Sequence, residues 1–293
     1  MRVKYRFFQY AYTTPALLFV AIFIMIPVIY TIVLSFTNLV LTKPEPLRFV
    51  GFENYRYLFH DSNLPLIFKN TVLYVIGSVI LALVIGLGIG VFLNIECKYN
   101  KFLRSIILLP WILPDVVVAL EWKWMLQGEM GIINELLTRL HILERYYPWI
   151  GSPKTAPLVT IVITAWRMAP FIALMVLASL RATPIELHES AKIDGATSRS
   201  IFRYIDLPLM LPNLIVVTLL MIIWIFNLFT IVYLVTDGGP AFASEILGTY
   251  IYRIGWRSFD VSRAAALSVL ALMFLLVLSL LYIFSFRKTI GGG

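Results

Sequence analysis

Three ionisable side chains, Asp115, Glu121 and Arg167, lie inside or beside long apolar stretches of this chain. A charge is costly at such positions, so each is a candidate for a functional role. Arg167 either faces a water-filled pathway or forms a static ion pair with a carboxylate such as Asp115. The sequence leaves both interpretations open. An Arg167→Met variant that keeps full activity would exclude the pathway role.

The groups that hydrolytic or metal-dependent chemistry needs are sparse. The chain has one cysteine, Cys97, and three scattered histidines, which argues against a His/Cys metal site. It contains neither H-E-x-x-H nor G-x-S-x-G, and it has no G-x-x-x-x-G-K-[ST] phosphate loop. We therefore expect no enzyme active site, no metal and no cofactor bound by this chain.

One apolar stretch carries side chains that suit a polar, ring-shaped solute. Trp224, Asn227, Leu228 and Ile231 fall on one side of a helix at three- and four-residue steps, and Tyr233 lies near its outer end. Sugars have hydroxyl groups at their edges and C–H groups on their faces, so an aromatic platform beside an amide fits them. Ordinary helix packing is the competing interpretation for each aromatic residue.

Composition places these candidates in a membrane. Hydrophobic residues make up 60% of the chain, charged residues 14%, and the mean hydropathy is +0.87. The net charge of +8 comes from basic residues that flank apolar stretches, which argues against nucleic-acid binding. Six stretches approach the length of about 20 residues that a spanning helix needs. They lie near residues 11–36, 71–95, 105–120, 158–180, 214–235 and 264–286.

The predicted fold is therefore an all-α membrane protein with six transmembrane helices in a single domain over residues 1–293. The third stretch is interrupted by Pro110, Pro114 and Asp115. In the second, Ala82, Gly86 and Gly90 recur every four residues, which predicts a close helix-helix interface. The first lacks an A-x-A cleavage site, so we interpret it as a retained anchor.

Orientation follows from the basic residues. Lys and Arg are about twice as dense at both termini and in the loops over 96–104 and 181–206 as in the opposite loops. The denser side is cytoplasmic by the positive-inside rule. Both termini and the 181–206 loop are therefore predicted to face the cytoplasm.

The segment over residues 184–208 is predicted to form a helix, a turn and a second helix outside the bilayer. Pro184 suits a helix start, and Glu186 and Glu189 favour the positive end of a helix dipole. Gly195 ends the first helix, because glycine reaches left-handed angles at little cost. A second helix over 198–205 is expected to end before Pro208.

The 184–208 segment resembles the cytoplasmic EAA motif of ABC importer permeases, which reads E-A-A, three residues, G, nine residues, I-x-L-P. Ser190 stands where the pattern has its second residue, Ala, and the other fixed positions match. The resemblance implies that this coupling loop contacts an ATP-hydrolysing subunit. The residues assigned to it are Glu189, Ser190, Ala191, Asp194, Gly195, Ile205, Leu207 and Pro208.

The resemblance extends over nearly the whole chain and is strongest to maltose-type carbohydrate-uptake permeases. The matching elements are Pro27 with Tyr30, Ser35-Phe36-Thr37, Gly51 with Asn54-Tyr55, Leu109-Pro110 with Pro114, Trp122-Lys123-Trp124 and Thr236-Asp237-Gly238-Gly239-Pro240. By the same resemblance, Asn227 and Phe171 fall on substrate-contacting positions. Together with Trp224, Tyr233 and Arg167, they are the candidates for the substrate path.

The function implied is that of a transmembrane permease subunit of an ATP-driven importer of a sugar or related polyol in the cell membrane. The implied partners are two copies of an ATP-binding subunit that holds ATP-Mg, a second, non-identical permease and an extracytoplasmic solute-binding protein. That protein would dock on the loops over 38–70 and 121–156. A permease for glycerol phosphate, an amino acid or an ion is the alternative, followed by an ion-coupled carrier.

Overall fold

A computed structural model describes residues 13–95 and 98–290. Within these residues the secondary structure is helical, apart from the two isolated bridges Thr37↔Phe49 and Val40↔Asp260. The chain divides into two compact units, one of residues 1–64 and 251–274 and one of residues 65–250 and 275–293. The sequence predicts a single domain, and this division into two compact units does not test that prediction.

Among the described residues, five helices are long and apolar enough to span a membrane: Thr13–Leu34, Leu64–Asn94, Ala156–Ala182, Ser198–Val235 and Val261–Phe286. The sixth candidate is a broken pair, Phe102–Ile112 and Asp115–Met125, whose halves meet at an angle of 94°. The six predicted apolar stretches each fall on one of these, and the all-α membrane fold class is confirmed.

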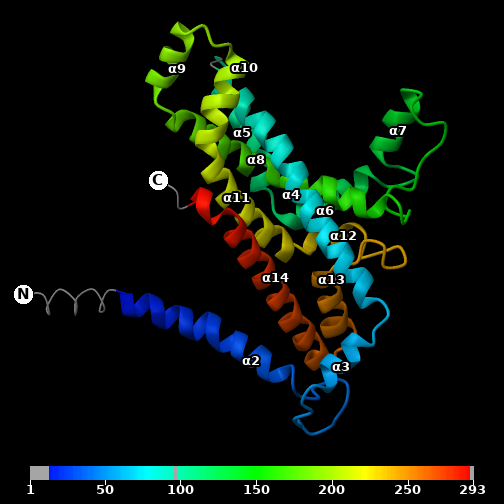
Figure 1. Ribbon diagram of the computed structural model, residues 1–293. Helices are drawn as coiled ribbons and strands as arrows, with labels where there is room; N and C mark the ends of the chain where they lie inside the picture. Colours follow the sequence, from blue (N-terminus) through cyan, green and yellow to red (C-terminus); the bar gives the residue numbers. More distant parts are fainter. Residues whose placement is uncertain (1–12, 96–97, 291–293) are drawn as a thin grey trace, which may run out of the picture. The chain divides into compact units, whose positions relative to one another are not determined.

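Unit 1 contains the first spanning helix, two short helical segments and the beginning of the last helix (Figure 1). Its elements are η1 (Ala21–Met25), α2 (Ile26–Leu34), α3 (Glu53–Phe59), η3 (Arg253–Arg257) and the first half of α14 (Val261–Ile290), where η marks a π-helical turn.

A cluster around Asn54 organises the turn between α2 and α3. We call it the Asn54 cluster: residues 35–37 together with 49–55. The buried Asn54 amide donates to Ser35 O at 2.9 Å and to Thr37 O at 2.8 Å. Phe36 packs against three aromatic rings, those of Phe49, Phe52 and Tyr55, with centroids 5.3 to 6.1 Å apart. The carbonyl groups that follow α2 therefore have their partners inside unit 1.

Unit 2 holds the second half of α14 and the remaining helices. They are α4 (Leu64–Asn94), which begins at the unit boundary, α5 (Asn100–Ile112), α6 (Asp115–Met125), α7 (Ile132–Arg139), α8 (Ala156–Ala182), α9 (Ile185–Ile193), α10 (Ser198–Ile201), η2 (Phe202–Asp206), α11 (Leu207–Asn227), α12 (Thr230–Val235) and α13 (Leu247–Tyr252), which ends just beyond the boundary. Helix α8 forms the core, because 56% of its most apolar stretch is buried, and α5 and α11 pack against it.

Helix α4 approaches α8 through its glycines. A Cβ atom added at Gly86 would lie 2.8 Å from Ala169 O, and one added at Gly90 would lie 2.8 Å from Ala173 O. Ala82, one turn earlier, is fully buried. Only residues without a side chain allow this backbone contact, so the small-residue interface predicted from the four-residue spacing is confirmed.

Two of the spans in unit 2 are broken rather than straight. The first break lies at Leu113 and Pro114, which have extended ψ angles of 141° and 142°. A proline pushes the preceding residue out of the α region, which explains this break. The second lies at Leu228, with φ −86° and ψ 80°, between α11 and α12. No proline or glycine marks the second break.

Candidate functional site

The two helix breaks border a hollow of about 300 Å³ within unit 2. We call it the broken-helix hollow. Its lining residues come from α5, α6, α8, α11 and the residue that follows α11: Trp111, Asp115, Arg167, Met168, Trp224, Asn227 and Leu228. Unwound backbone at membrane depth is tolerated where it lines a cavity or is buried in protein. The broken-helix hollow is bordered by two such segments of unwound backbone, one at Leu113 and Pro114 and one at Leu228.

An ion pair holds the first break in place. Arg167 pairs with Asp115, and its Nη2 also donates a hydrogen bond to Leu113 O at 3.3 Å. Asp115 lies in the first turn of α6, where a carboxylate is favoured by the helix dipole. The side chains of Arg167 and Asp115 are 12% and 31% exposed. The pair therefore satisfies a carbonyl at the end of α5 and joins α6 to α8, and it also lines the broken-helix hollow.

Three aromatic rings from three helices gather beside this pair. Phe171 of α8 lies between Trp111 of α5 and Trp224 of α11, with ring centroids 5.4 Å and 5.1 Å apart. Trp224 is 40% exposed. The Asn227 amide is exposed at the last residue of α11, where its Nδ2 donates to Ile223 O at 2.8 Å. The hollow thus combines aromatic faces with an amide, a carboxylate and a guanidinium.

The structure unites four of the five substrate-path candidates. Arg167, Trp224 and Asn227 line the broken-helix hollow, and Phe171 contacts two of its rings. Tyr233 does not belong to the lining; it lies on α12, where its ring is 6.3 Å from that of Phe229.

The continuous helical face expected from Trp224 to Ile231 is wrong. The helix ends at Asn227, and Ile231 is fully buried on α12. Sequence reasoning also missed Trp111, which lines the hollow. Its position between Pro110 and Pro114, within the predicted interruption of the third span, was a usable signal.

The 184–208 segment begins with α9, which has no buried residue. Gly195 follows it with a positive φ of 79°. The Gly195 amide donates to Lys192 O at 3.0 Å, and the Ala196 amide donates to Ala191 O at 2.9 Å. This pair of bonds is the Schellman pattern that ends a helix with glycine in the left-handed region. The predicted helix, turn and second helix are confirmed.

The second half of the segment differs from the expectation. The chain does not leave the helical state before Pro208: α10 passes through the π-helical turn η2 directly into α11, and Pro208 lies in its first turn. A proline at that position needs no backbone donor, which makes it compatible with a continuing helix. The fifth span therefore begins at Ser198 rather than near residue 214.

The eight assigned residues of this segment fall into two groups. Glu189, Ser190 and Ala191 lie on α9, followed by Asp194 at its C-cap and Gly195 in the turn. Ile205 belongs to η2, and Leu207 and Pro208 open α11. Most of the segment is exposed, including Ile193, which is 86% exposed. Apolar groups so exposed are typical of a contact surface.

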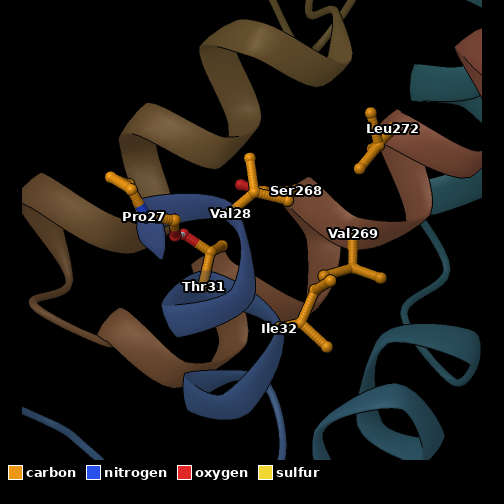
Figure 2. A pocket seen from close by; sticks show the side chains of 7 residues that line it. All are labelled: Pro27, Val28, Thr31, Ile32, Ser268, Val269 and Leu272. Atoms are coloured by element: carbon orange, nitrogen blue, oxygen red, sulfur yellow. Dashed lines mark hydrogen bonds between the residues drawn. The ribbon is translucent and has the colours of Figure 1, made fainter. Parts of the chain in front are cut away.

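A further hollow, of about 260 Å³, lies in unit 1 between α2 and α14 (Figure 2). Its polar groups are the Thr31 and Ser268 hydroxyls, which donate to Pro27 O at 2.9 Å and Ala264 O at 2.8 Å in their own helices. The other lining side chains are apolar. This hollow therefore offers little to orient a polar solute. Within residues 13–95 and 98–290, no cluster of His, Cys, Asp and Glu could hold a metal ion.

The apolar helices, and the two breaks that border a hollow lined by polar and aromatic residues, are features of a multi-span membrane protein. The particular family follows from comparison with known proteins. Residues 78–288 match the family described as the binding-protein-dependent transport system inner membrane component, and the chain belongs to that family.

Relatives in this family cover almost the whole chain. The sulfoquinovosyl glycerol transport system permease protein SmoG of Agrobacterium fabrum is 33% identical over 87% of this chain and 82% of that protein. The trehalose/maltose transport system permease protein MalF of Thermococcus litoralis is 32% identical over 96% of this chain and 95% of that protein. A crystal structure of a bacterial alginate ABC transporter, in complex with alginate pentasaccharide-bound periplasmic protein, has a chain with a TM-score of 0.85, 22% identity and coverage of 100% and 98%. That likeness shows the fold.

Proposed function

We propose that this chain is a transmembrane permease subunit of an ATP-driven importer for a sugar or related polyol. The observation that carries the proposal is the broken-helix hollow, where Trp111 and Trp224 lie beside Asp115, Arg167 and Asn227. Aromatic faces pack on the C–H faces of a sugar ring, and the polar groups can bind its hydroxyls. The names of SmoG and MalF support this choice of solute, since sulfoquinovosyl glycerol contains a sugar and trehalose and maltose are disaccharides.

Energy for transport would come from a separate subunit that binds ATP-Mg, present in two copies. The sequence has no phosphate loop of its own. The 184–208 segment is the proposed docking element, because α9 is exposed along its length and is joined by a tight turn to the helix that becomes α11. Both termini and this segment would face the cytoplasm. The chain itself would bind no cofactor.

The remaining partners follow from the same proposal. A solute-binding protein outside the membrane would deliver the sugar to the loops over 38–70 and 121–156, and a second, non-identical permease would complete the pathway. The crystal structure with a substrate-bound periplasmic protein supports the first of these. No role for nucleic acid is proposed.

ATP hydrolysis by the assembled complex in liposomes tests the function. The complex needs its ATPase, its second permease and its binding protein, and the solutes are maltose, trehalose, sulfoquinovosyl glycerol, glycerol phosphate and histidine. We expect stimulation by a saccharide. Stimulation by glycerol phosphate or histidine alone would move the assignment to another solute. Uptake abolished by an ionophore but insensitive to ATP depletion would replace the importer by an ion-coupled carrier.

Two variants test whether the broken-helix hollow is the path. Asn227→Ala and Trp224→Ala should raise the KM of uptake by about tenfold, since each removes a contact worth roughly 1–2 kcal/mol. The matched control is Asn213→Ala on the same helix, because Asn213 bonds Ser179 Oγ at 2.6 Å and does not line the hollow. An equal effect of all three variants would contradict the assignment.

A further inference from the structure

One side-chain bond joins α9 to the helix that leads into α11. His188 Nε2 lies 2.8 Å from Asp206 Oδ1, across 18 positions of the sequence. Because an ionised carboxylate only accepts hydrogen bonds, the imidazole Nε2 carries the proton and donates it. Neither residue is among the eight residues assigned to the coupling loop, and no sequence pattern predicts that they pair.

The two ends of this bond differ in burial. The Asp206 side chain is 11% exposed at the last position of η2, directly before α11, whereas the His188 side chain is 25% exposed. Helix α9 buries no residue, so it has little apolar packing to fix it against its neighbours. Within the described part of the chain, the His188 bond therefore supplies a directional contact where burial supplies almost none.

The helix that begins near Asp206 reaches the broken-helix hollow. Figure 1 shows α9 and α10 at the end of α11 that carries its first residues. Residues 198–227 are helical without interruption through α10, η2 and α11, and Asp206 precedes Trp224 by 18 residues, which corresponds to roughly 27 Å of helix. A displacement of α9 that is passed to Asp206 would thus reach a hollow-lining residue through continuous helix.

We propose that the His188–Asp206 bond makes α9 and the base of α11 move as one body, so that His188 is a positioning residue for the coupling of ATP hydrolysis to transport. The inference rests on the proposed function of the chain. Gly195 provides the opposite property: its turn, with open space around the missing side chain, would let α9 rotate if nothing else held it.

Distance measurements between two spin labels test the rigid connection. The labels are placed at Ile185→Cys on α9, a residue that is 65% exposed, and at Leu209→Cys on α11, which is 52% exposed, with Cys97→Ser removing the native thiol. The assembled complex is measured without nucleotide and after trapping with ATP-Mg and vanadate. We expect one narrow distance distribution that is the same in both states.

Three further variants in the labelled protein isolate the bond. His188→Ala should broaden the distribution and make it differ between the two states, and it should lower maltose or trehalose uptake per ATP hydrolysed by about tenfold. His188→Gln keeps a donor at similar reach and should restore both. The matched control, His60→Ala, removes an exposed imidazole that bonds only locally to Arg56 O and should leave the label distance unchanged.

Each outcome decides the proposal. An unchanged distance and an unchanged uptake per ATP in His188→Ala would overturn it, whereas a wild-type complex without saccharide-stimulated ATP hydrolysis would overturn the proposed function instead. If His188→Ala does not assemble, His188→Leu fills the same half-buried site without a donor and is measured in its place. Assembly by His188→Gln alone would make the bond a requirement for folding and would also overturn the positioning role.

Discussion

The Asn54 cluster in unit 1 and the 184–208 segment in unit 2 both resemble motifs of one permease family, yet their polar groups are used in opposite ways. In the Asn54 cluster the Asn54 amide makes two internal bonds, and the Ser35 hydroxyl bonds the Tyr55 hydroxyl at 2.7 Å. In the 184–208 segment α9 buries nothing, and Glu189, Ser190 and Gly195 are exposed.

This difference between internally bonded and exposed polar groups shows that a sequence motif can have two different physical causes. Residues whose hydrogen bonds are completed inside the chain are explained by folding, because an unpaired buried polar group is costly. Residues that remain exposed are not explained by the stability of this chain, and the proposed contact with a partner subunit would account for them. The first motif therefore predicts a loss of stability on substitution, and the second predicts a loss of coupling at nearly unchanged stability.

The largest expected effect concerns the ion pair of the broken-helix hollow, an internal contact of the first kind. Arg167→Met should lower the free energy of unfolding by about 3–5 kcal/mol, because it leaves the Asp115 carboxylate without its partner. Denaturant unfolding of the purified chain in micelles measures this change. The double variant Arg167→Met, Asp115→Leu should regain most of the loss. A stable but transport-defective single variant would show instead that Arg167 serves the solute path alone.

Asn54→Ala should have the next largest effect on stability. It removes both donors to the carbonyls of Ser35 and Thr37 and should cost about 2–3 kcal/mol. The control is Asn38→Ala, because Asn38 makes its bonds at the surface and should cost under about 1 kcal/mol. Thermal unfolding of the two variants side by side measures the difference. Equal costs would remove the distinction between the Asn54 cluster and exposed loop contacts.

Gly195→Asp tests the exposed motif. The substitution should cost only about 1–2 kcal/mol, since it forces a side chain into the left-handed region at φ 79° while the surrounding space is open. Uptake per ATP hydrolysed should nevertheless fall by about tenfold, because the α9 surface is displaced. Gly195→Asn, whose side chain tolerates this conformation better, is the milder control. Full ATP-dependent uptake by Gly195→Asp would place this segment with the folding motifs.

The smallest expected effect concerns Glu135, an exposed carboxylate whose hydrogen-bond partners lie within the chain. The Tyr146 hydroxyl and the Arg139 guanidinium, which lies 2.6 Å from Glu135 Oε1, both hydrogen-bond the Glu135 carboxylate and lower its pKa below the ordinary value of 4.5. A carboxyl group with a lowered pKa stabilises the folded loop above its ordinary pKa, and this contribution is lost as the pH falls through the lowered value.

Hydrogen exchange of the α7 amides measures this contribution. The ratio of exchange rates in Glu135→Gln and wild-type protein should exceed one near neutral pH and approach one below pH 4.5. Comparing the two proteins at the same pH cancels the intrinsic pH dependence of exchange. A ratio that does not change with pH would show that the bond contributes nothing in solution.

Much of the fold could be predicted from features that are local in the sequence. Six apolar stretches predicted the spanning helices, Pro114 predicted the interruption of the third, and Gly195 predicted the turn in the 184–208 segment. The four-residue repeat of Ala82, Gly86 and Gly90 predicted a close helix contact, although not with α8. These features are set by residues that are near in sequence, so periodicity and backbone preference reveal them.

The continuity of α10 with α11 and the break at Leu228 were not predictable in the same way. Pro208 predicts the end of a helix, yet it fits the first turn of a helix that continues. Leu228 has no helix-breaking chemistry; it is 8% exposed, and the Tyr74 hydroxyl from α4 donates to its carbonyl at 3.1 Å. A contact from residue 74 to residue 228 holds backbone open at a position that local preference would leave helical.

The sequence by itself therefore determined that this protein is a membrane protein with up to six spans and an exposed helix-turn-helix segment, because hydrophobic length and glycine angles are local properties. Only the tertiary structure decided which side chains meet: Asp115 with Arg167, Phe171 between Trp111 and Trp224, and His188 with Asp206. Those contacts depend on how separate helices pack around α8, and a hydrogen bond or ring contact between distant residues leaves no periodic trace in the chain.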